Sequence, residues 1–277
     1  MFNNRSIIEG ALPQIQVKPI AHYTRIGTLC HFISDNMPGW GSAWATPVQF
    51  LNDRKELSLG LKVLHTVANR QPLSGQIVRA SIDNLLTTSG GLGTDAYQMS
   101  FSGDPDELGQ WRGYAVNGMG CSIVTDILAV KKVADVAGWV IYDPKKQMAF
   151  AGKILRQLRS ENDINRIEQV LIASASYMKH EGFKPEEEFR LLKFPASKEV
   201  KFRESGDRLV PYVDYLNGVG ISLPVNKIII GPGWQLSTLQ PGEFARNHVV
   251  QGVQRLLTAR RLHTTDIESS RIPYDPK

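Results

Sequence analysis

Alternation of apolar and polar positions is clearest in the segment that begins at Glu186, where acidic residues pass into apolar ones without a turn signal. If this segment is a strand, Phe189 and Leu191 point to one face and Glu188 and Arg190 to the other, together with Glu186. One face is then core, and the other holds two carboxylates and a guanidinium. Such a charged face is either a functional site or the solvent-exposed side of an edge strand.

Similar apolar periodicities predict the other elements of the chain. Strands are expected at 97–102, 118–124, 136–142, 186–194, 209–214, 226–231 and 262–268, and helices at about 146–159, 162–181 and 241–259. The helices lie between scattered strands without regular alternation, which favours an α+β fold over a doubly wound sheet. We expect a single domain over residues 1–277, with helical elaborations at about 53–95 and 145–182.

A strand-to-helix corner is predicted near the N-terminus. Residues 19–24 have the pattern of a short strand, and the apolar positions of residues 26–33 have helical spacing. Thr24 lies between them and is a good N-cap, because its hydroxyl can accept a backbone N–H of the first helical turn. His22 and Tyr23 are therefore expected at the corner.

Two further helix starts are visible. Asp53 and Glu56 have the spacing of a capping box at the start of a leucine-rich helix. Asp104 and Pro105 are expected to open a short helix that holds residues 110–114.

The composition is that of an ordinary soluble globular protein. A chain of 277 residues with 42% hydrophobic residues can bury a large core. No stretch approaches the roughly 20 apolar residues of a membrane helix, and the first residues lack the pattern of a signal peptide. We therefore expect a cytoplasmic protein without membrane contact.

Metal-binding and dinucleotide motifs are not found in the sequence. Cys30 and Cys121 give neither a disulfide pattern nor zinc spacing, and the six histidines form no HExxH-like cluster. The glycines within residues 89–93 do not fit G-x-G-x-x-G, because no apolar strand precedes them. We expect no metal site, and a loop turn at these glycines.

Positive charge is concentrated in one part of the chain. Residues 145–203 hold 13 Lys or Arg against 8 Asp or Glu, a surplus of five that equals the net charge of +5 for the whole chain. A basic surface bordering the charged strand suits a phosphate-rich partner. A solvated helix face of Lys and Arg is the alternative, and a pI of 9.1 is a modest signal.

Several short motifs follow one another along nearly the whole chain. They are HYT, LND, SFS, WRGY, ExExR, IIIGP and SRIPY, and they span residues 19–274. In this order they resemble a bacterial family long described as of unknown function, which is itself similar to divergent ADP-ribosyltransferases of the H-Y-E type. The resemblance implies a split β-sheet core with flanking helices and a helical insertion.

The resemblance also implies a set of site residues for NAD, the substrate of that class. Release of nicotinamide develops positive charge on the ribose, and an ionised carboxylate stabilises it. Glu188 matches the catalytic acid, and Glu186 would orient or deprotonate the incoming nucleophile. His22 matches the residue that contacts the ribose, and Thr24 would be a neighbouring polar contact.

The other implied NAD contacts leave alternatives open. Tyr114 matches the ring that stacks on nicotinamide, but Tyr23 stands where many transferases have glycine and is the other candidate for the tyrosine of the triad. Ser102 of the SFS motif is a further expected contact. Arg112 and Arg190 would bind the pyrophosphate or pair with the carboxylates, since a guanidinium suits either partner.

The resemblance implies transfer of ADP-ribose from NAD to a macromolecule without a metal. Bacterial enzymes similar to this class often act as toxins in toxin–antitoxin or antiphage systems, held in check by an inhibitory partner protein. The basic surface favours RNA or DNA over protein as acceptor. An NAD glycohydrolase, with water in place of the acceptor, and a noncatalytic module that binds nucleic acid or a protein partner are the alternatives.

Overall fold

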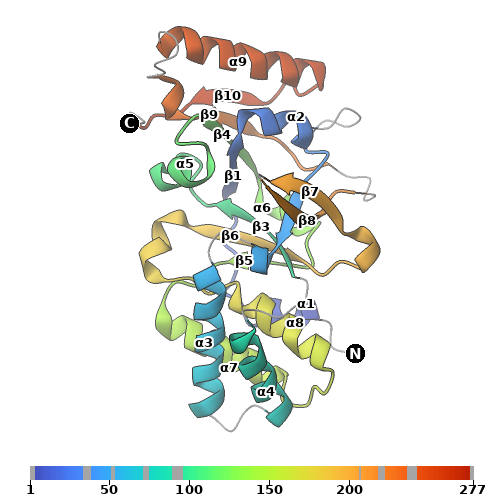
Figure 1. The fold of residues 1–277 in the computed structure, drawn as a ribbon. Helices are drawn as coiled ribbons and strands as arrows, with labels where there is room; N and C mark the ends of the chain where they lie inside the picture. The colour runs from blue at the N-terminus through green and yellow to red at the C-terminus, as the bar shows by residue number, and fades with distance from the viewer. Residues whose placement is uncertain are drawn as a thin grey trace.

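The computed structural model describes residues 4–33, 39–50, 54–70, 75–88, 96–205, 207–217, 222–235 and 242–274, and the fold is a mixed α+β fold built on an open sheet (Figure 1). Within the described residues, ten strands form the sheet. Eight of them follow in the order β10 (Asp266–Ser269), β9 (Lys227–Ile230), β4 (Gly120–Asp126), β1 (Pro19–Arg25), β3 (Tyr97–Ser102), β2 (Trp44–Pro47), β8 (Arg208–Asp214) and β7 (Lys201–Ser205). The other two, β6 (Glu188–Lys193) and β5 (Val136–Trp139), branch from β3.

The helices of the described chain vary widely in length. The α-helices are α1 (Asn4–Glu9), α2 (Leu29–Phe32), α3 (Arg54–Arg70), α4 (Gln76–Thr87), α5 (Leu108–Tyr114), α6 (Ile127–Lys131), α7 (Pro144–Gln157), α8 (Ile164–Ala175) and α9 (Gly242–Ala259). Short 3-10 helices are η1 (Ile26–Thr28), η2 (Val48–Phe50), η3 (Glu181–Glu186), η4 (Ser197–Glu199) and η5 (Pro232–Gln235).

Strand β3 is the branch point of the sheet. One of its edges pairs with β6 over its whole length, from Tyr97 to Ser102. Its other edge pairs with β2 at Tyr97 and Gln98, and with β1 through the single pair of Ser102 and Ala21. Strand β1 instead follows β4 over all seven of its residues. The sheet therefore opens between β1 and β3, beside the middle of β3.

The two larger hydrophobic cores of the described chain use opposite faces of β5 and β6. Helices α1, α3, α4, α7 and α8 share one core with the inner residues of β5 and β6, and they form the helical layer below the sheet in Figure 1. The second core joins the other face of the sheet to α2, α6 and α9. Both segments expected as helical elaborations, 53–95 and 145–182, contain helices, and these helices pack against one another.

The charged segment differs from its expected geometry. Strand β6 begins at Glu188, because Glu187 adopts a left-handed conformation with φ of 42° and Glu186 ends η3. Glu186 is therefore not on the strand. Strand β6 is also not an edge strand, since it lies between β3 and β5, and the side chain of Arg190 is buried. The solvent-exposed alternative for this segment is wrong.

The predicted passage from strand to helix near the N-terminus is confirmed, because β1 leads directly into η1 and α2, but the predicted cap at Thr24 is wrong. Strand β1 continues to Arg25, so His22 and Tyr23 lie within the strand. Thr24 caps no helix, and its hydroxyl oxygen lies 2.9 Å from that of Thr28 in a hydrogen bond. Lateral pairing with β4 outweighs the local capping signal here, because it satisfies backbone groups along the whole strand.

Other boundaries shift by a few residues. Helix α5 starts at Leu108 rather than at Asp104, with the Glu107 carboxylate as N-cap at 2.7 Å from the amide nitrogen of Gln110. Helix α8 ends at Ala175, before the expected end at 181. The last expected strand, 262–268, is found at 266–269. Asp53, the LND motif and the glycines of 89–93 lie outside the described residues. None of the helices that the structure describes has the length and apolarity to cross a membrane.

Close packing of α3 on α8 generates a stability prediction. A Cβ added at Gly60 would overlap the backbone carbonyl of Ala175, whereas one added at Gly152 would meet only ordinary contacts at 3.9 Å. Gly60→Ala should lower the unfolding free energy by about 1–2 kcal/mol, because overpacking outweighs the better helix propensity of Ala. Urea denaturation measures this.

Gly152→Ala is the matched control, since this glycine also lies inside a buried helix. It should be neutral or stabilising by up to about 1 kcal/mol. Equal effects of the two substitutions would contradict the close approach of α3 and α8.

Candidate active site

A cavity of about 380 Å³ lies where β1 and β3 part. One face of β6, β3 and β2 contributes Glu188, Arg190, Ser100, Gln98, Thr46 and Trp44. The segment from β1 to α2 contributes His22, Thr24, Thr28 and Phe32, and α3 and α5 contribute Glu56, Gln110 and Tyr114. The cavity thus collects residues from three parts of the chain, within 21–56, 98–114 and 179–203.

Five charged side chains, which we call the charge network, meet at this cavity: Glu56, Lys179, Glu186, Glu188 and Arg190. Lys179 Nζ lies 2.7 Å from Glu56 Oε1 and 2.6 Å from Glu186 Oε2. The same ammonium lies 3.2 Å from Glu188 Oε2. Arg190 Nη2 lies 2.7 Å from Glu56 Oε2 and 2.5 Å from Glu188 Oε2, and Arg190 Nε donates to Glu188 Oε1 at 2.7 Å.

The members of the charge network come from four segments of the chain. Glu56 lies in the first turn of α3, Lys179 in the loop after α8, and Glu186 at the end of η3. Glu188 and Arg190 are two apart in β6 and therefore share a face. Three carboxylates face two cations, so the network has a net charge of −1 when all are ionised.

Glu188 is held as a carboxylate. Burial by itself would raise the pKa of its carboxyl group, but the Arg190 guanidinium and the Lys179 ammonium outweigh burial and lower the pKa to about 2. The backbone N–H of Glu188 donates to the Tyr142 hydroxyl at 2.9 Å, which fixes the start of the strand. A buried carboxylate that is ionised at neutral pH therefore faces the cavity.

The pKa of Glu186 is shifted in the opposite direction. Burial raises the pKa of its carboxyl group above the ordinary value, and contact with Lys179 only partly offsets that effect. Its backbone carbonyl accepts a hydrogen bond from the Ser102 hydroxyl at 2.8 Å. Two carboxylates with divergent pKa values in one cavity are typical of a pair with different chemical roles.

His22 fills the opening in the sheet. Its Nδ1 donates to the carbonyl oxygen of Ser100 at 2.9 Å, in the middle of the β3 edge that has no strand partner there. The ring packs edge-on against Phe32, Trp40 and Phe101, with ring centroids 5.7, 6.0 and 5.7 Å away. Burial lowers the pKa of the imidazole, so the ring is neutral with its proton on Nδ1. Among the described residues, Nε2 has no hydrogen-bond partner.

The two candidate tyrosines lie in different environments. The ring of Tyr23 is buried against Trp111, at 4.8 Å between ring centroids. Its hydroxyl donates to the carbonyl of Asp104 at 2.9 Å and accepts the N–H of Glu107 at 2.8 Å. Both tyrosines are among the residues that line the cavity, but only Tyr114 has half of its surface exposed. Tyr114 therefore has the available ring, and Tyr23 holds the turn before α5.

Of the remaining residues expected to contact NAD, some line the cavity and one does not. Thr24 and Ser102 line the cavity, although both are buried and their hydroxyls are engaged within the protein. Arg190 is occupied by the charge network. The guanidinium of Arg112 lies outside the cavity lining, 5.1 Å from the centre of the Tyr274 ring.

Sequence reasoning missed Glu56 and Lys179 as members of the site. In the sequence, Glu56 fits a capping box and nothing more, and Lys179 follows an apolar helix without any motif around it. Only the packing of α3 and α8 beneath β6 brings them together. In the described part of the chain, no group of three or more His, Cys, Asp or Glu side chains is placed to hold a metal ion.

Comparison with known proteins gives one family match. A family model described as a protein of unknown function, DUF2971, matches residues 110–191. The matched segment contains Tyr114 and every member of the charge network except Glu56. The match agrees with the expected resemblance to a family of unknown function. It gives no information on activity. No curated protein and no solved structure matches the chain.

The divergent pKa values of the two glutamates generate a pH prediction. The pKa of Glu188 lies below its ordinary value, so its stabilisation is present above about pH 4.5 and is lost as the pH falls toward 2. Glu188→Gln should lower the unfolding free energy at pH 7 by on the order of 3 kcal/mol. Urea denaturation of parent and variant should show this difference shrinking toward pH 3.

Glu186→Gln is the internal comparison, because the pKa of Glu186 is raised and not lowered in the folded protein. Ionisation of Glu186 therefore reduces the stability of the parent as the pH rises toward that pKa. This variant should be as stable as the parent at pH 7, or more stable. Equal losses for both variants would contradict the assigned shifts.

Proposed function

We propose that this protein is an NAD-dependent ADP-ribosyltransferase that releases nicotinamide and transfers ADP-ribose to a macromolecular acceptor. The observation that carries the proposal is Glu188, a buried carboxylate with a pKa of about 2 that faces a cavity in the opened sheet. Cleavage of the nicotinamide–ribose bond develops positive charge at C1′, and a fixed anion stabilises that charge. The net charge of −1 on the charge network suits this task.

His22 and Tyr114 support the same assignment. The unpartnered Nε2 of His22 is available to accept a hydrogen bond from a ribose hydroxyl, and its tautomer is fixed by the Ser100 carbonyl. The exposed ring of Tyr114 is available to stack on the nicotinamide. Of the two tyrosines that the sequence leaves open, we propose Tyr114.

Glu186 is the proposed base for the second half of the reaction. Nicotinamide leaves as a neutral molecule with the electron pair of the broken C–N bond. The acceptor hydroxyl or amine then attacks C1′, and its proton passes to the Glu186 carboxylate. The raised pKa of Glu186 suits proton acceptance, whereas the low pKa of Glu188 suits charge stabilisation. Attack by water at the same step would make the protein an NAD glycohydrolase.

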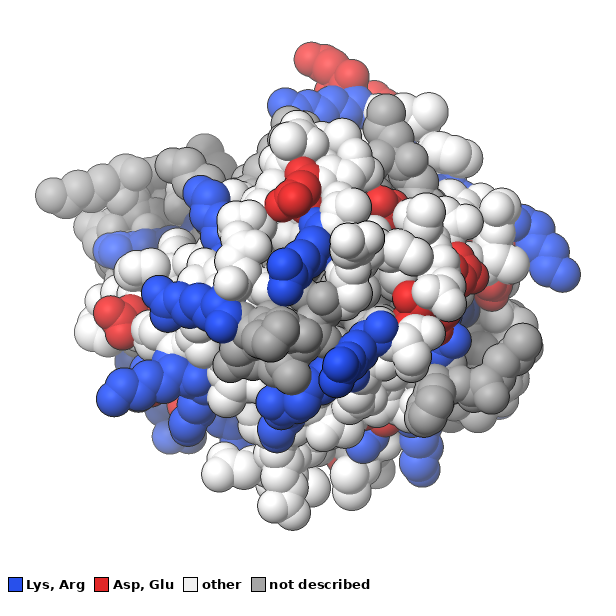
Figure 2. Space-filling view, turned by 90° about the horizontal axis from the view of Figure 1, so that it is seen from below, with Lys and Arg blue, Asp and Glu red and all other residues white. Residues whose placement is uncertain are grey.

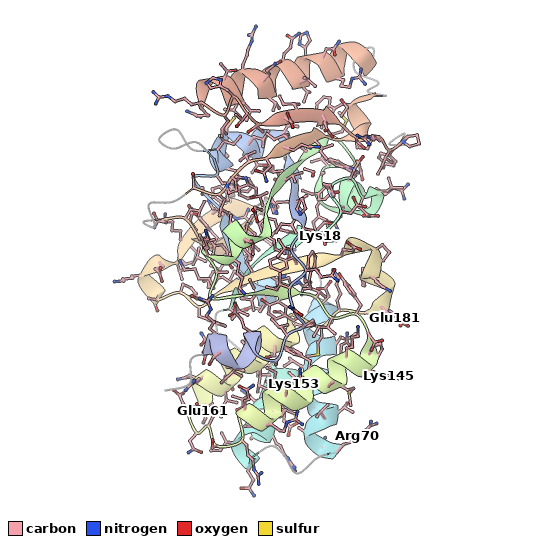
Figure 3. All side chains as sticks on the ribbon, turned by 180° about the vertical axis from the view of Figure 1, so that it is seen from behind. Lys18, Arg70, Lys145, Lys153, Glu161 and Glu181 are labelled. Carbon is pink, nitrogen blue, oxygen red and sulfur yellow. The ribbon has the colours of Figure 1, made fainter. Side chains whose placement is uncertain are left out.

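The acceptor that we propose is nucleic acid, on the basis of the exposed cations of α7 and the residues after it. These are Lys145, Lys146, Lys153, Arg156 and Arg159, and none has an ion pair within the described residues. Figure 2 shows Lys and Arg outnumbering Asp and Glu on the end of the molecule that the helical layer forms, and Figure 3 labels Lys145 and Lys153 along α7. Such a surface suits a polyphosphate backbone. A role as a toxin or defence enzyme, with an inhibitory protein partner, belongs to the same proposal.

Turnover of NAD tests the catalytic assignment. Purified protein is incubated with NAD labelled on the adenylate phosphate, alone and with total RNA, DNA or cell lysate, and nicotinamide release is measured. Glu188→Gln should lower nicotinamide release by about 100-fold or more, since it removes the charge that stabilises the transition state. Tyr114→Ala, at an exposed position, should raise the KM for NAD while the fold is kept.

Glu181→Gln is the matched control, an exposed glutamate of η3 outside the cavity, and should leave turnover unchanged. Release of nicotinamide with no labelled acceptor would indicate hydrolysis. If no acceptor supports turnover and Glu188→Gln still binds RNA, the protein is a noncatalytic binding module and not an enzyme.

Charge reversal on α7 tests the acceptor. The double variant Lys146→Glu with Lys153→Glu should lower both RNA affinity and RNA labelling, with a weaker salt dependence of binding, because fewer phosphate contacts are neutralised. Nicotinamide release without acceptor should stay at the parent rate, since both residues lie outside the cavity. Labelling of a protein fraction and not of nucleic acid would overturn this choice of acceptor.

A further inference from the structure

Arg203 lines the same cavity as Glu188 but belongs to the far side of the sheet, in β7. Directly paired residues share a face of a sheet, and so do residues two apart in one strand. The pairs that connect the two residues are Glu188 with Ser102, Gln98 with Thr46, Trp44 with Asp214, and Tyr212 with Lys201. Glu188, Trp44 and Arg203 therefore lie on one face, across which the cavity extends.

The environment of Arg203 differs from that of the other two Lys or Arg side chains in the lining. Lys179 and Arg190 are neutralised within the charge network. Arg203 has no carboxylate partner within the described residues, and its Nε is buried without a hydrogen-bond partner. Its guanidinium lies 5.8 Å from the centre of the Trp44 ring, which restricts its orientation.

A buried N–H without a partner is unfavourable, and such groups in native proteins call for an explanation. An anion that enters the cavity would supply the missing acceptor. A planar guanidinium matches a phosphate group in both charge and geometry, because two parallel N–H donors can reach two oxygens. The half-buried Trp44 beneath it offers an aromatic face at the same place.

The distance between Glu188 and the Trp44–Arg203 pair fits a substrate whose reacting group and phosphates are separated. Trp44 stands on β2, two strands away from β6 and Glu188, which corresponds to roughly 10 Å across the sheet. We infer that Arg203, supported by Trp44, binds the pyrophosphate of a dinucleotide whose ribose lies at Glu188. This inference rests on the proposed function and names the residue that holds the charged part of its substrate.

Direct binding separates the role of Arg203 from catalysis. ADP-ribose and adenosine are titrated into the full-length protein by calorimetry, for the parent, Arg203→Gln and Arg203→Lys. Arg203→Gln should weaken ADP-ribose binding by at least tenfold and leave adenosine binding unchanged, because only ADP-ribose carries the pyrophosphate. Arg203→Lys should keep part of the affinity, since the charge remains and the paired donors are lost.

Arg208→Gln is the matched control, an exposed arginine of the same hairpin outside the cavity lining, and should bind ADP-ribose like the parent. Unchanged ADP-ribose affinity in Arg203→Gln, or equal losses for ADP-ribose and adenosine, would overturn the inference. Nicotinamide release with an unchanged KM for NAD in Arg203→Gln would overturn it while keeping the transferase. Arg203-dependent ADP-ribose binding without any nicotinamide release would keep the phosphate subsite and overturn the transferase.

Discussion

Arg190 holds the sheet to the helical layer through partners from three different segments. Its guanidinium donates to the carbonyl of Ser176 just after α8, to Glu56 on α3, and to Glu188 on its own strand. Taking these charges out of water is costly, and the cost is offset only when every donor and acceptor is paired. Loss of either cation would leave buried carboxylates uncompensated, so the position of β6 on α3 and α8 depends on Arg190 and Lys179 together.

The same network that joins the two layers also defines the chemistry of the cavity. Its surplus of one carboxylate keeps the Glu188 end negative, and the low pKa of Glu188 fixes that charge over a wide pH range. Arg203 makes the other end positive. A cavity with an anion at one end and a cation at the other orients a substrate that develops positive charge at one point and carries phosphates at another. In the proposed transferase these two ends hold the ribose and the pyrophosphate.

The opening between β1 and β3 provides the space for this site. A continuous sheet would place β1 against the whole edge of β3 and leave no cavity there. With a single shared pair, Ala21 and Ser102, the carbonyl of Ser100 needs another donor, and His22 supplies it. The hydrogen bond that completes the sheet thus also fixes the imidazole tautomer. The structural role of His22 and its proposed contact with ribose therefore fall on the same side chain.

The sequence by itself determined the mixed α+β class, the limits of β3, and the charged character of the segment around Glu188, because these follow from local periodicity and composition. It also selected His22, Tyr114, Glu186 and Glu188, all of which line one cavity. Tertiary structure alone decided that β6 is internal, that Glu186 lies before the strand, and that Tyr23 is buried. It also brought Glu56, Lys179 and Arg203 to the site. Those outcomes depend on contacts between segments that are distant in the sequence, such as the pair of Glu56 and Arg190, which no local pattern encodes.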